Sequence, residues 1–254
     1  MKRFKMKKEV NRVTISKAIS EFCKYLLSKD IGRYIVKIIH FGSTARGEES
    51  KRSDVDIMVV SSDGKEVRKR VAEAAFEIQT NYGIDIQPIV ENLDDIVFVN
   101  SYFIFNVLSY GREVYSVKKE NLKKEACRNL TRLAEEYIDA ARDSLKNKHP
   151  RLAVDAAYNA AELGVKAMLL LKLDDIPGSH GGVVGKFGEL YVKSGEMSKT
   201  LGRRLNEILE LRNSARYKYQ ALIGGREASE TINLAESIIE LARKKIFSDS
   251  RQKE

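Results

Sequence analysis

The fold is decided by two runs that lie close together in the sequence, FGSTARG at Phe41–Gly47 and SDVDIMVV at Ser53–Val60. The apolar, β-branched segment Ile35–Phe41 before the first run predicts a buried strand, and the second run predicts another. Because side chains alternate along a strand, Asp54 and Asp56 are expected on one face. Hard divalent cations prefer oxygen ligands, so two carboxylates beside a turn that can hold phosphate indicate a site for Mg²⁺ and a nucleoside triphosphate.

The turn between the two strands carries its own electrostatic argument. If Ser43 is the N-cap of a short helix, Arg46 stands at the third helical position, where a cation opposes the positive end of the helix dipole. An anion bound by backbone N–H groups, the Ser43 hydroxyl and Arg46 removes that conflict. Gly42 and Gly47 allow the backbone to approach such a ligand closely.

A third carboxylate is available further along the chain. The segment Ile84–Val90 is another strand candidate, in which Asp85 and Gln87 share the face opposite the apolar side chains. If this strand lies beside the second one, Asp85 completes a carboxylate triad with the first two aspartates. Pro88 places the strand at an edge of the sheet, or at the point where it leaves the sheet.

Plain structural explanations stay open for these features. A Gly-Ser turn alone can be an ordinary turn, and an Asp-x-Asp pair alone can be a solvated strand face. Asp94 and Asp95 could replace Asp85, although they open a predicted helix, where acidic residues complement the dipole. Lys51 and Arg52 could neutralise phosphate or could simply be solvated.

The combination of these motifs closely resembles the polymerase β nucleotidyltransferase superfamily, especially its small bacterial and archaeal members, over roughly residues 30 to 116. The resemblance implies an α/β fold with a mixed sheet flanked by helices. It also implies two Mg²⁺ (or Mn²⁺) ions and transfer of a nucleoside monophosphate from an NTP to an acceptor. By this resemblance Gly42 and Ser43 bind the triphosphate, and Asp54 and Asp56 hold both metals. Asp85 binds the catalytic metal and activates the acceptor hydroxyl.

Composition excludes several other classes of protein. A chain of 254 residues with 43% hydrophobic and 32% charged residues is expected to be globular, with one large or two modest domains. No apolar run approaches the length of a membrane span, and the basic start at Met1–Lys8 leads into no apolar signal segment. Cys23 and Cys127 are isolated, so we expect a cytoplasmic protein without a disulfide or a zinc site.

The net charge of +9 raises the question of a nucleic-acid partner. The excess is spread over both halves of the chain, and only the first twelve residues form a dense basic cluster. That cluster could contact phosphate, although a solvated arm also explains it. Nucleic acid is therefore only a weakly indicated partner.

From about Lys118 the alternating pattern gives way to long helical periodicity. We expect residues 1–117 to form the α/β domain and residues 118–254 an all-α bundle of five helices with short loops. The expected helices are Leu122–Lys146, Pro150 to about Leu173, Val183–Lys193, Ser198 to about Ser214, and Arg226–Phe247. Alanines at positions 153, 156, 157, 160 and 161 allow a neighbouring helix to approach closely.

This second half resembles a HEPN domain, the helical partner that often accompanies minimal nucleotidyltransferases. The resemblance rests on YNAAE at Tyr158–Glu162, on His180-Gly181, and on LRNSARYKY at Leu211–Tyr219. Ribonuclease members carry Arg, a polar residue, about three further residues and then His, often followed by a Tyr two positions on.

The match to that ribonuclease pattern is incomplete. Arg212 fits it, Tyr217 stands where the His would be, and Tyr219 matches the trailing Tyr. A phenol with a pKa near 10 is a poor substitute for imidazole at neutral pH. These residues could cap and pack a helix end, line a groove for a substrate or partner, or include an acceptor hydroxyl. In toxin–antitoxin relatives the trailing Tyr is what the nucleotidyltransferase modifies.

The sequence thus predicts a nucleotidyltransferase that moves a nucleotide, with AMP favoured, from Mg²⁺–NTP to a hydroxyl on a protein or small molecule. The helical domain is expected to position the acceptor. The same division resembles the aminoglycoside nucleotidyltransferases, whose subunits pair, so a homodimer is also expected. The alternatives are a metal-independent ribonuclease that works from Arg212 and a non-catalytic nucleotide-binding or antitoxin-like regulator.

Overall fold

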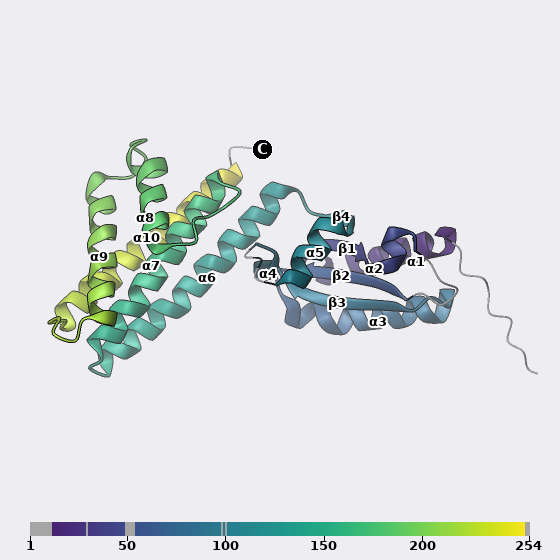
Figure 1. The fold of residues 1–254 in the computed structure, drawn as a ribbon, viewed down its shortest axis with the longest axis horizontal. Coiled ribbons are helices and arrows are strands. Elements are labelled where there is room, and N and C mark those ends of the chain that lie inside the picture. Colours follow the sequence, from purple (N-terminus) through teal and green to yellow (C-terminus); the bar gives the residue numbers. More distant parts are fainter. Residues whose placement is uncertain (1–11, 29, 49–53, 98, 100, 252–254) are drawn as a thin grey trace, which may run out of the picture. The chain divides into compact units, whose positions relative to one another are not determined.

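The computed structural model describes residues 12–28, 30–48, 54–97, 99 and 101–251. The chain divides into two compact units, the first ending at Leu122 and the second beginning at Lys123 (Figure 1). The basic segment 1–11 and the residues Lys51, Arg52 and Ser53 lie outside the described part. No helix in the described part is long and apolar enough to cross a membrane.

The first unit is a mixed sheet with helices. Its strands are β1 (Ile35–Phe41), β2 (Val55–Ser61), β3 (Ile86–Asn92) and β4 (Arg112–Ser116). Its helices are α1 (Arg12–Leu27), the 3₁₀ turn η1 (Asp30–Tyr34), α2 (Gly42–Arg46), α3 (Gly64–Tyr82), α4 (Leu93–Val97) and α5 (Tyr102–Tyr110). The predicted α/β fold with a mixed sheet is confirmed.

The strands lie in the order β3-β2-β1-β4. Strand β1 runs antiparallel to β2 and β4, whereas β2 and β3 run parallel. The third strand therefore lies beside the second and at the edge of the sheet, as Pro88 predicts. It begins at Ile86, two residues later than the sequence pattern suggests, so Asp85 directly precedes it.

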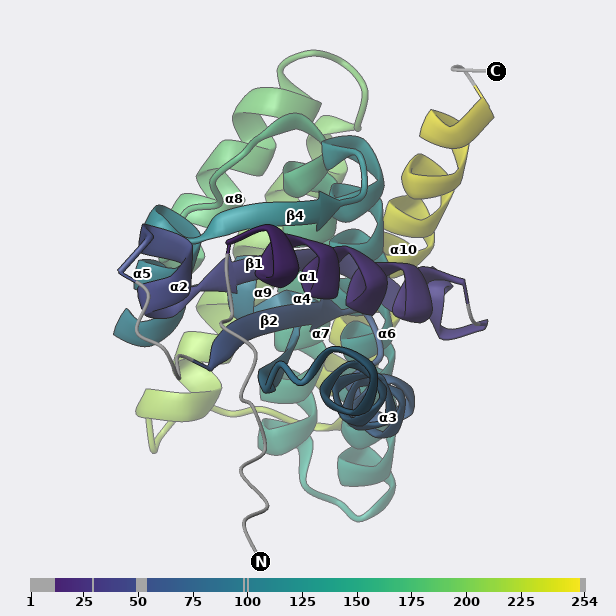
Figure 2. The same ribbon diagram turned by 90° about the vertical axis from the view of Figure 1, so that its right-hand side faces the viewer.

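Helices α1 and α3 cover one face of this sheet (Figure 2). Their apolar side chains join Ile38, Val55, Ile57 and Ile86 in one buried core. The alternate residues of these strands face the other side of the sheet. On that side Phe41 of β1 packs edge to face against Phe103 of α5, with 5.7 Å between ring centroids. The alternation thus places Asp54 and Asp56 on the face opposite α1 and α3.

The second unit is a helical bundle, as predicted. Its helices are α6 (Lys119–Lys146, which begins just before the unit), α7 (Pro150–Lys172), α8 (His180–Phe187), the π-turn η2 (Gly188–Val192), α9 (Lys199–Tyr217) and α10 (Gly225–Arg251). The alanine-rich α7 packs against α8, α9 and α10. A Cβ atom on Gly164 would lie 3.1 Å from Ile238 of α10, so the small residues of α7 do admit a close neighbour.

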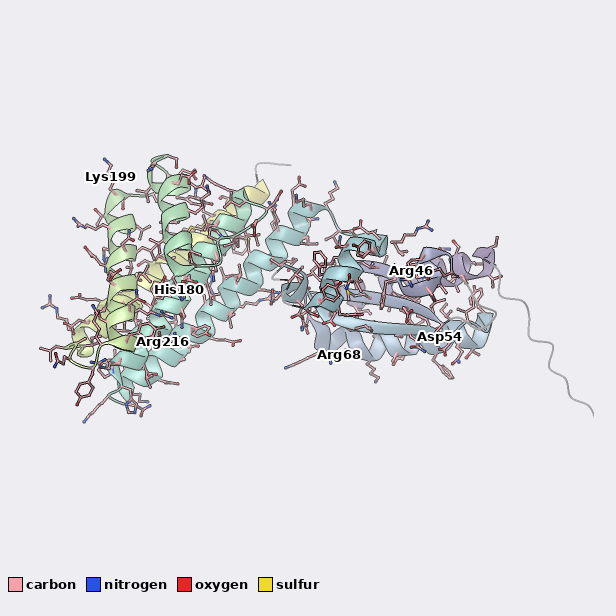
Figure 3. The ribbon with its side chains drawn as sticks, viewed as in Figure 1. Arg46, Asp54, Arg68, His180, Lys199 and Arg216 are labelled. Carbon is pink, nitrogen blue, oxygen red and sulfur yellow. The ribbon has the colours of Figure 1, made fainter. Side chains whose placement is uncertain are left out.

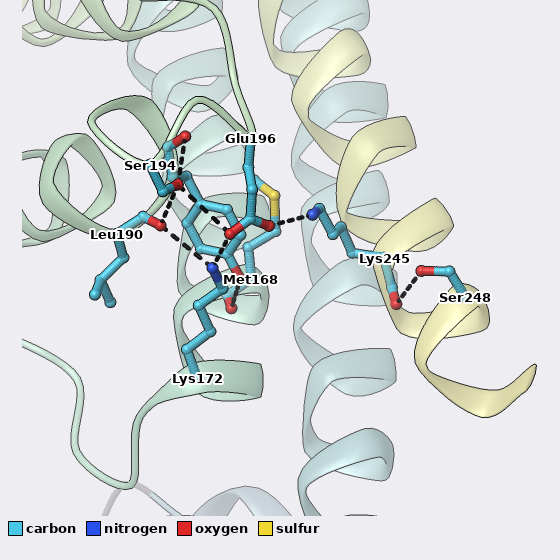
Figure 4. A network of polar contacts seen from close by, with 8 residues as sticks. Met168, Lys172, Leu190, Ser194, Glu196, Lys245 and Ser248 are labelled. Atoms are coloured by element: carbon cyan, nitrogen blue, oxygen red, sulfur yellow. Dashed lines mark hydrogen bonds and ion pairs between the residues drawn. The ribbon is translucent and has the colours of Figure 1, made fainter. Parts of the chain in front are cut away.

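One carboxylate ties three segments of the bundle together (Figure 4). Glu196, in the turn after η2, forms ion pairs with Lys172 of α7 and with Lys245 of α10, the latter at 2.5 Å. The hydrogen bonds from Lys172 and then Lys245 lower the pKa of Glu196 to about 2. The lowered pKa means that folding favours the charged carboxylate. The contact therefore stabilises the bundle fully at pH values above the ordinary carboxyl pKa, and this stabilisation is lost as the pH falls toward 2.

Candidate active site

Helix α2 differs from its prediction in where it begins. It runs from Gly42 to Arg46 with Phe41 as N-cap, so the expectation that Ser43 is the N-cap and Arg46 the third helical residue is wrong. The helix begins at Gly42, whose φ of 78° is an angle that glycine adopts without the strain that other residues would bear. Arg46 stands in the last turn, where the dipole favours a cation, and pairs with Glu48 at 3.0 Å.

The two glycines at the ends of α2 adopt the positive φ angles that favour glycine. Gly42 has a φ of 78° and Gly47 a φ of 77°, and Gly47 ends the helix as its C-cap. A Cβ atom on Gly42 would collide with the carboxylate of Asp56. The glycine therefore lets the start of α2 approach the carboxylate on β2.

Replacing Gly42 with Ala is expected to lower the free energy of unfolding by about 2–4 kcal/mol, because it adds a collision to a backbone strain of about 1 kcal/mol or more. Gly83→Ala is the matched control, since Gly83 has a φ of 68° and nothing within 4 Å of an added Cβ. Urea denaturation measures both losses. In an Asp56→Ala background, Gly42→Ala should cost only as much as Gly83→Ala; equal losses in the native background would contradict the collision.

The two aspartates lie as the strand alternation predicts. Asp54 directly precedes β2 and is exposed, and Asp56 is half-buried within the strand, opposite Phe41 of β1. Burial raises the pKa of Asp56, and the neighbouring charge of Asp54 raises it further. A bound cation would relieve this repulsion, so the donor chemistry of the pair fits Mg²⁺ or Mn²⁺.

Asp85 lies level with this pair on the adjacent strand. Val55 is in register with Ile86, and the Val55 amide donates to the Asp85 carbonyl oxygen at 2.9 Å. Asp54 and Asp85 thus precede neighbouring parallel strands at the same level. Across the described residues, however, no three His, Cys, Asp or Glu side chains lie close enough to hold a metal ion together. The role of Asp85 in a triad stays a prediction.

The sequence did not predict two polar contacts of the sheet, one on each face. The Gln87 side-chain amide donates to the Asp54 carboxylate at 2.8 Å. The only sequence signal was that Gln87 shares a strand face with Asp85. On the other face of the sheet, His40 Nε2 lies 2.8 Å from the Thr44 hydroxyl, and both residues are buried. A lone His four residues before a Thr gives no such signal. Figure 3 labels Arg46, which lies on α2, and Asp54, which directly precedes β2.

The helical unit separates the three candidate residues of the ribonuclease-like pattern. Arg212 is only 4% exposed, and its Nε donates to Asp155 at 3.0 Å. Its guanidinium also lies 5.7 Å from the ring centroid of Tyr158. Tyr217 and Tyr219 are 72% and 97% exposed. The arginine is therefore held in the interior while both phenols face outward.

Arg151 holds the loop that carries Tyr219. Its guanidinium donates to the carbonyl oxygens of Ala215, Lys218, Tyr219 and Ala221, at 2.9, 3.0, 2.8 and 2.5 Å. Only the planar, five-donor arginine side chain can span so many acceptors. The backbone of this loop is fixed although its tyrosine side chain is exposed.

A second polar cluster fixes the start of α8. The Glu162 carboxylate accepts hydrogen bonds from Tyr158, at 2.9 Å, and from His180, and it pairs with Lys166 at 2.8 Å. Burial opposes the charged form of Glu162, but the hydrogen bonds from Lys166 and His180 outweigh it and lower the pKa. His180, labelled in Figure 3, thus anchors α8 to α7.

Comparison with known proteins matches each half of the chain separately. The family model described as a nucleotidyltransferase domain matches residues 16–127, and the one described as a HEPN domain matches residues 127–245. A Methanocaldococcus jannaschii protein provisionally named protein adenylyltransferase MJ0604 is 41% identical over 39% of this chain and 96% of its own length.

Two further relatives also match parts of the chain. A Thermotoga maritima protein named UPF0332 protein is 30% identical over 50% of this chain and 95% of its own length. A second M. jannaschii protein, provisionally named toxin MJ0605, is 36% identical over 37% of this chain and 69% of its own length. Each relative matches no more than about half of the present chain.

Proposed function

The chain belongs to the nucleotidyltransferase family in its N-terminal half and to the HEPN family in its C-terminal half. On that premise we propose that it transfers a nucleoside monophosphate, AMP in particular, from an NTP to an acceptor hydroxyl. The observation that carries the proposal is the approach of Gly42 to the Asp56 carboxylate beside Asp54. It brings a turn suited to phosphate next to a carboxylate pair suited to divalent cations.

Each residue has a defined part in the proposed reaction. The acceptor oxygen forms a bond to the α-phosphorus, the bond to the bridging oxygen breaks, and pyrophosphate leaves. Asp85 accepts the proton of the acceptor hydroxyl and passes it to water. Gly42, Ser43 and Arg46 bind the triphosphate. Asp54 and Asp56 would hold two Mg²⁺ (or Mn²⁺) ions, and Asp85 would also bind the catalytic one. The ions would neutralise charge on the triphosphate and pyrophosphate.

We assign residues 1–117 to the catalytic domain and residues 118–254 to a domain that positions the acceptor. A relative with the provisional name of protein adenylyltransferase supports a protein hydroxyl as the acceptor. A small molecule is the alternative acceptor. We also propose that the protein acts as a homodimer, as implied by its resemblance to the aminoglycoside nucleotidyltransferases.

Labelled nucleotides test the proposed transfer. The protein is incubated with cell extract, Mg²⁺ and ATP labelled either at the α- or at the γ-phosphate. Covalent label should appear on an acceptor from α-labelled ATP alone, and Asp54→Asn should lose it. Label from γ-labelled ATP would indicate phosphorylation instead, and tight binding with no label from any of the four NTPs would favour the non-catalytic regulator.

The ribonuclease alternative receives little support from the helical unit, because Arg212 is buried against Asp155 and a tyrosine replaces the catalytic His. We expect no RNA cleavage by the purified protein in a metal-free buffer at neutral pH, measured on labelled RNA. Cleavage that disappears in Arg212→Ala would reverse this ordering and make the N-terminal half a regulator of the helical half.

The 97% exposure of Tyr219 favours a second candidate, modification of the chain's own tyrosine. If it occurs, incubation with Mg²⁺–ATP adds one adenylate to the intact mass, and the addition is lost in Tyr219→Phe and in Asp54→Asn. Tyr217→Phe is the matched control, since Tyr217 is also exposed. An adenylate that persists in Tyr219→Phe would exclude this tyrosine as the acceptor.

A further inference from the structure

The first unit contains a pocket that, of the residues of the predicted site, only Arg46 and Gly47 line. It has a volume of about 920 Å³ and lies between α1, α2, the end of β1 and the edge strand β4. Small-molecule sites in proteins fall in the range of about 300–1,000 Å³. The pocket is therefore large enough for a ligand of its own.

The pocket lies on the opposite side of the sheet from Asp54 and Asp56. His40 lines it, and His40 follows the core residue Ile38 by two positions, so both face α1. Asp56 is in register with Phe41, the next residue of β1, which faces the other way. A ligand in this pocket therefore cannot contact the carboxylate pair.

The lining of the pocket combines an apolar floor with a cationic rim. Helix α1 contributes Ile15, Ile19 and Leu27 and, between them, hydroxyl groups that include that of Ser20. The basic side chains at the rim are those of Lys24, Arg46 and Arg112. The acidic side chain there, Glu113, already pairs with Lys37 at 2.5 Å.

The rim charge is incompletely neutralised. Lys24 pairs with Glu21 and Arg46 pairs with Glu48. Within the described part of the chain, no carboxylate is in ion-pair contact with Arg112, which is exposed on the outer strand. An anionic group at the mouth would gain charge-assisted hydrogen bonds, while an attached apolar body would cover the floor.

We propose that this pocket binds a small organic anion, with one phosphate, sulfonate or carboxylate group on an apolar body. The anionic group pairs with Arg112 at the rim, and the apolar body lies against Ile15 and Ile19 of α1. Arg46 lines this pocket and is also assigned to the triphosphate, so the two sites are told apart by Arg112 and α1, which take no part in the proposed nucleotide transfer.

The test uses anilinonaphthalene sulfonate, an aromatic sulfonate whose fluorescence rises in apolar sites, with the full chain. We expect saturable binding of one probe per chain, displaced by dodecyl phosphate. Arg112→Gln should weaken the affinity about tenfold, the value of one charged hydrogen bond. Ser20→Trp, which fills the mouth from an exposed position on α1, should weaken it at least as much.

Two control variants separate this pocket from other sites on the chain. Arg226→Gln removes an exposed cation from the helical unit, and Phe105→Ser removes an exposed aromatic ring from α5. Both should leave the affinity unchanged, and thermal melts should show that all four variants are folded. The proposal is overturned if the probe fails to bind, if neither pocket variant weakens binding, or if Phe105→Ser abolishes it.

Discussion

Replacing either Asp54 or Asp56 with Asn is expected to abolish the binding of Mg²⁺–ATP, with a loss of affinity of at least about 100-fold. Each substitution keeps the shape of the side chain and removes an anionic oxygen ligand. Substitution of residues that only orient a metal ligand lowers metal affinity by about 10–100-fold, so the loss of a direct ligand should have a larger effect. Isothermal calorimetry with Mg²⁺–ATP measures the effect.

The fold should survive these substitutions. Burial and the charge of Asp54 both disfavour the ionised form of Asp56, so Asp56→Asn removes an unfavourable charge and should not lower the free energy of unfolding. Asp139→Asn, at an exposed position of the helical unit, is the control for the loss of one negative charge. Unchanged Mg²⁺–ATP affinity in both site variants would show that the assignment of the site is wrong.

Asp85→Asn is expected to separate binding from turnover. The variant should bind Mg²⁺–ATP nearly as well as the native protein, because Asp54 and Asp56 are intact. It should transfer nucleotide about 100- to 10,000-fold more slowly, since a positioned general base contributes factors of that size. Calorimetry measures the first quantity and the rate of label transfer from α-labelled ATP the second.

Asp94→Asn and Asp95→Asn are the matched controls for this prediction. Both residues stand in the first turn of α4, and the Asp95 carboxylate accepts a hydrogen bond from the Asn92 amide at 3.3 Å. We expect transfer to persist in both. Full activity in Asp85→Asn together with its loss in either control would move the role of general base to α4.

The first unit shows which features can be predicted from a sequence. Strict alternation in β2 predicted that Asp54 and Asp56 share a face, because the spacing of side chains along a strand is fixed. The position of Pro88 predicted an edge strand for the same kind of local reason. The predicted start of α2 was wrong, because whether the helix begins at Gly42 or at a later residue depends on how the turn packs against Asp56.

Contacts between distant segments were beyond prediction. No pattern links Arg212 to Asp155, which stand 57 positions apart, although their ion pair decides that this arginine is buried. The pocket beside α1 likewise needs β4 to pair with β1, a long-range register that hydrophobic periodicity does not contain. Hydrophobic periodicity in the sequence predicts helices and strands, whereas the surfaces that stay uncovered depend on how those elements pack together.

The four hydrogen bonds of Arg151 have a consequence for recognition at Tyr219. Ordering a residue of a mobile loop costs about 1–2 kcal/mol of conformational entropy. Here Arg151 already holds the loop backbone, so an association at Tyr219 would add mainly the side-chain entropy of the tyrosine to the usual loss of translational and rotational freedom. The loop backbone is preorganised, so a macromolecule could bind at Tyr219 without a folding step in this loop.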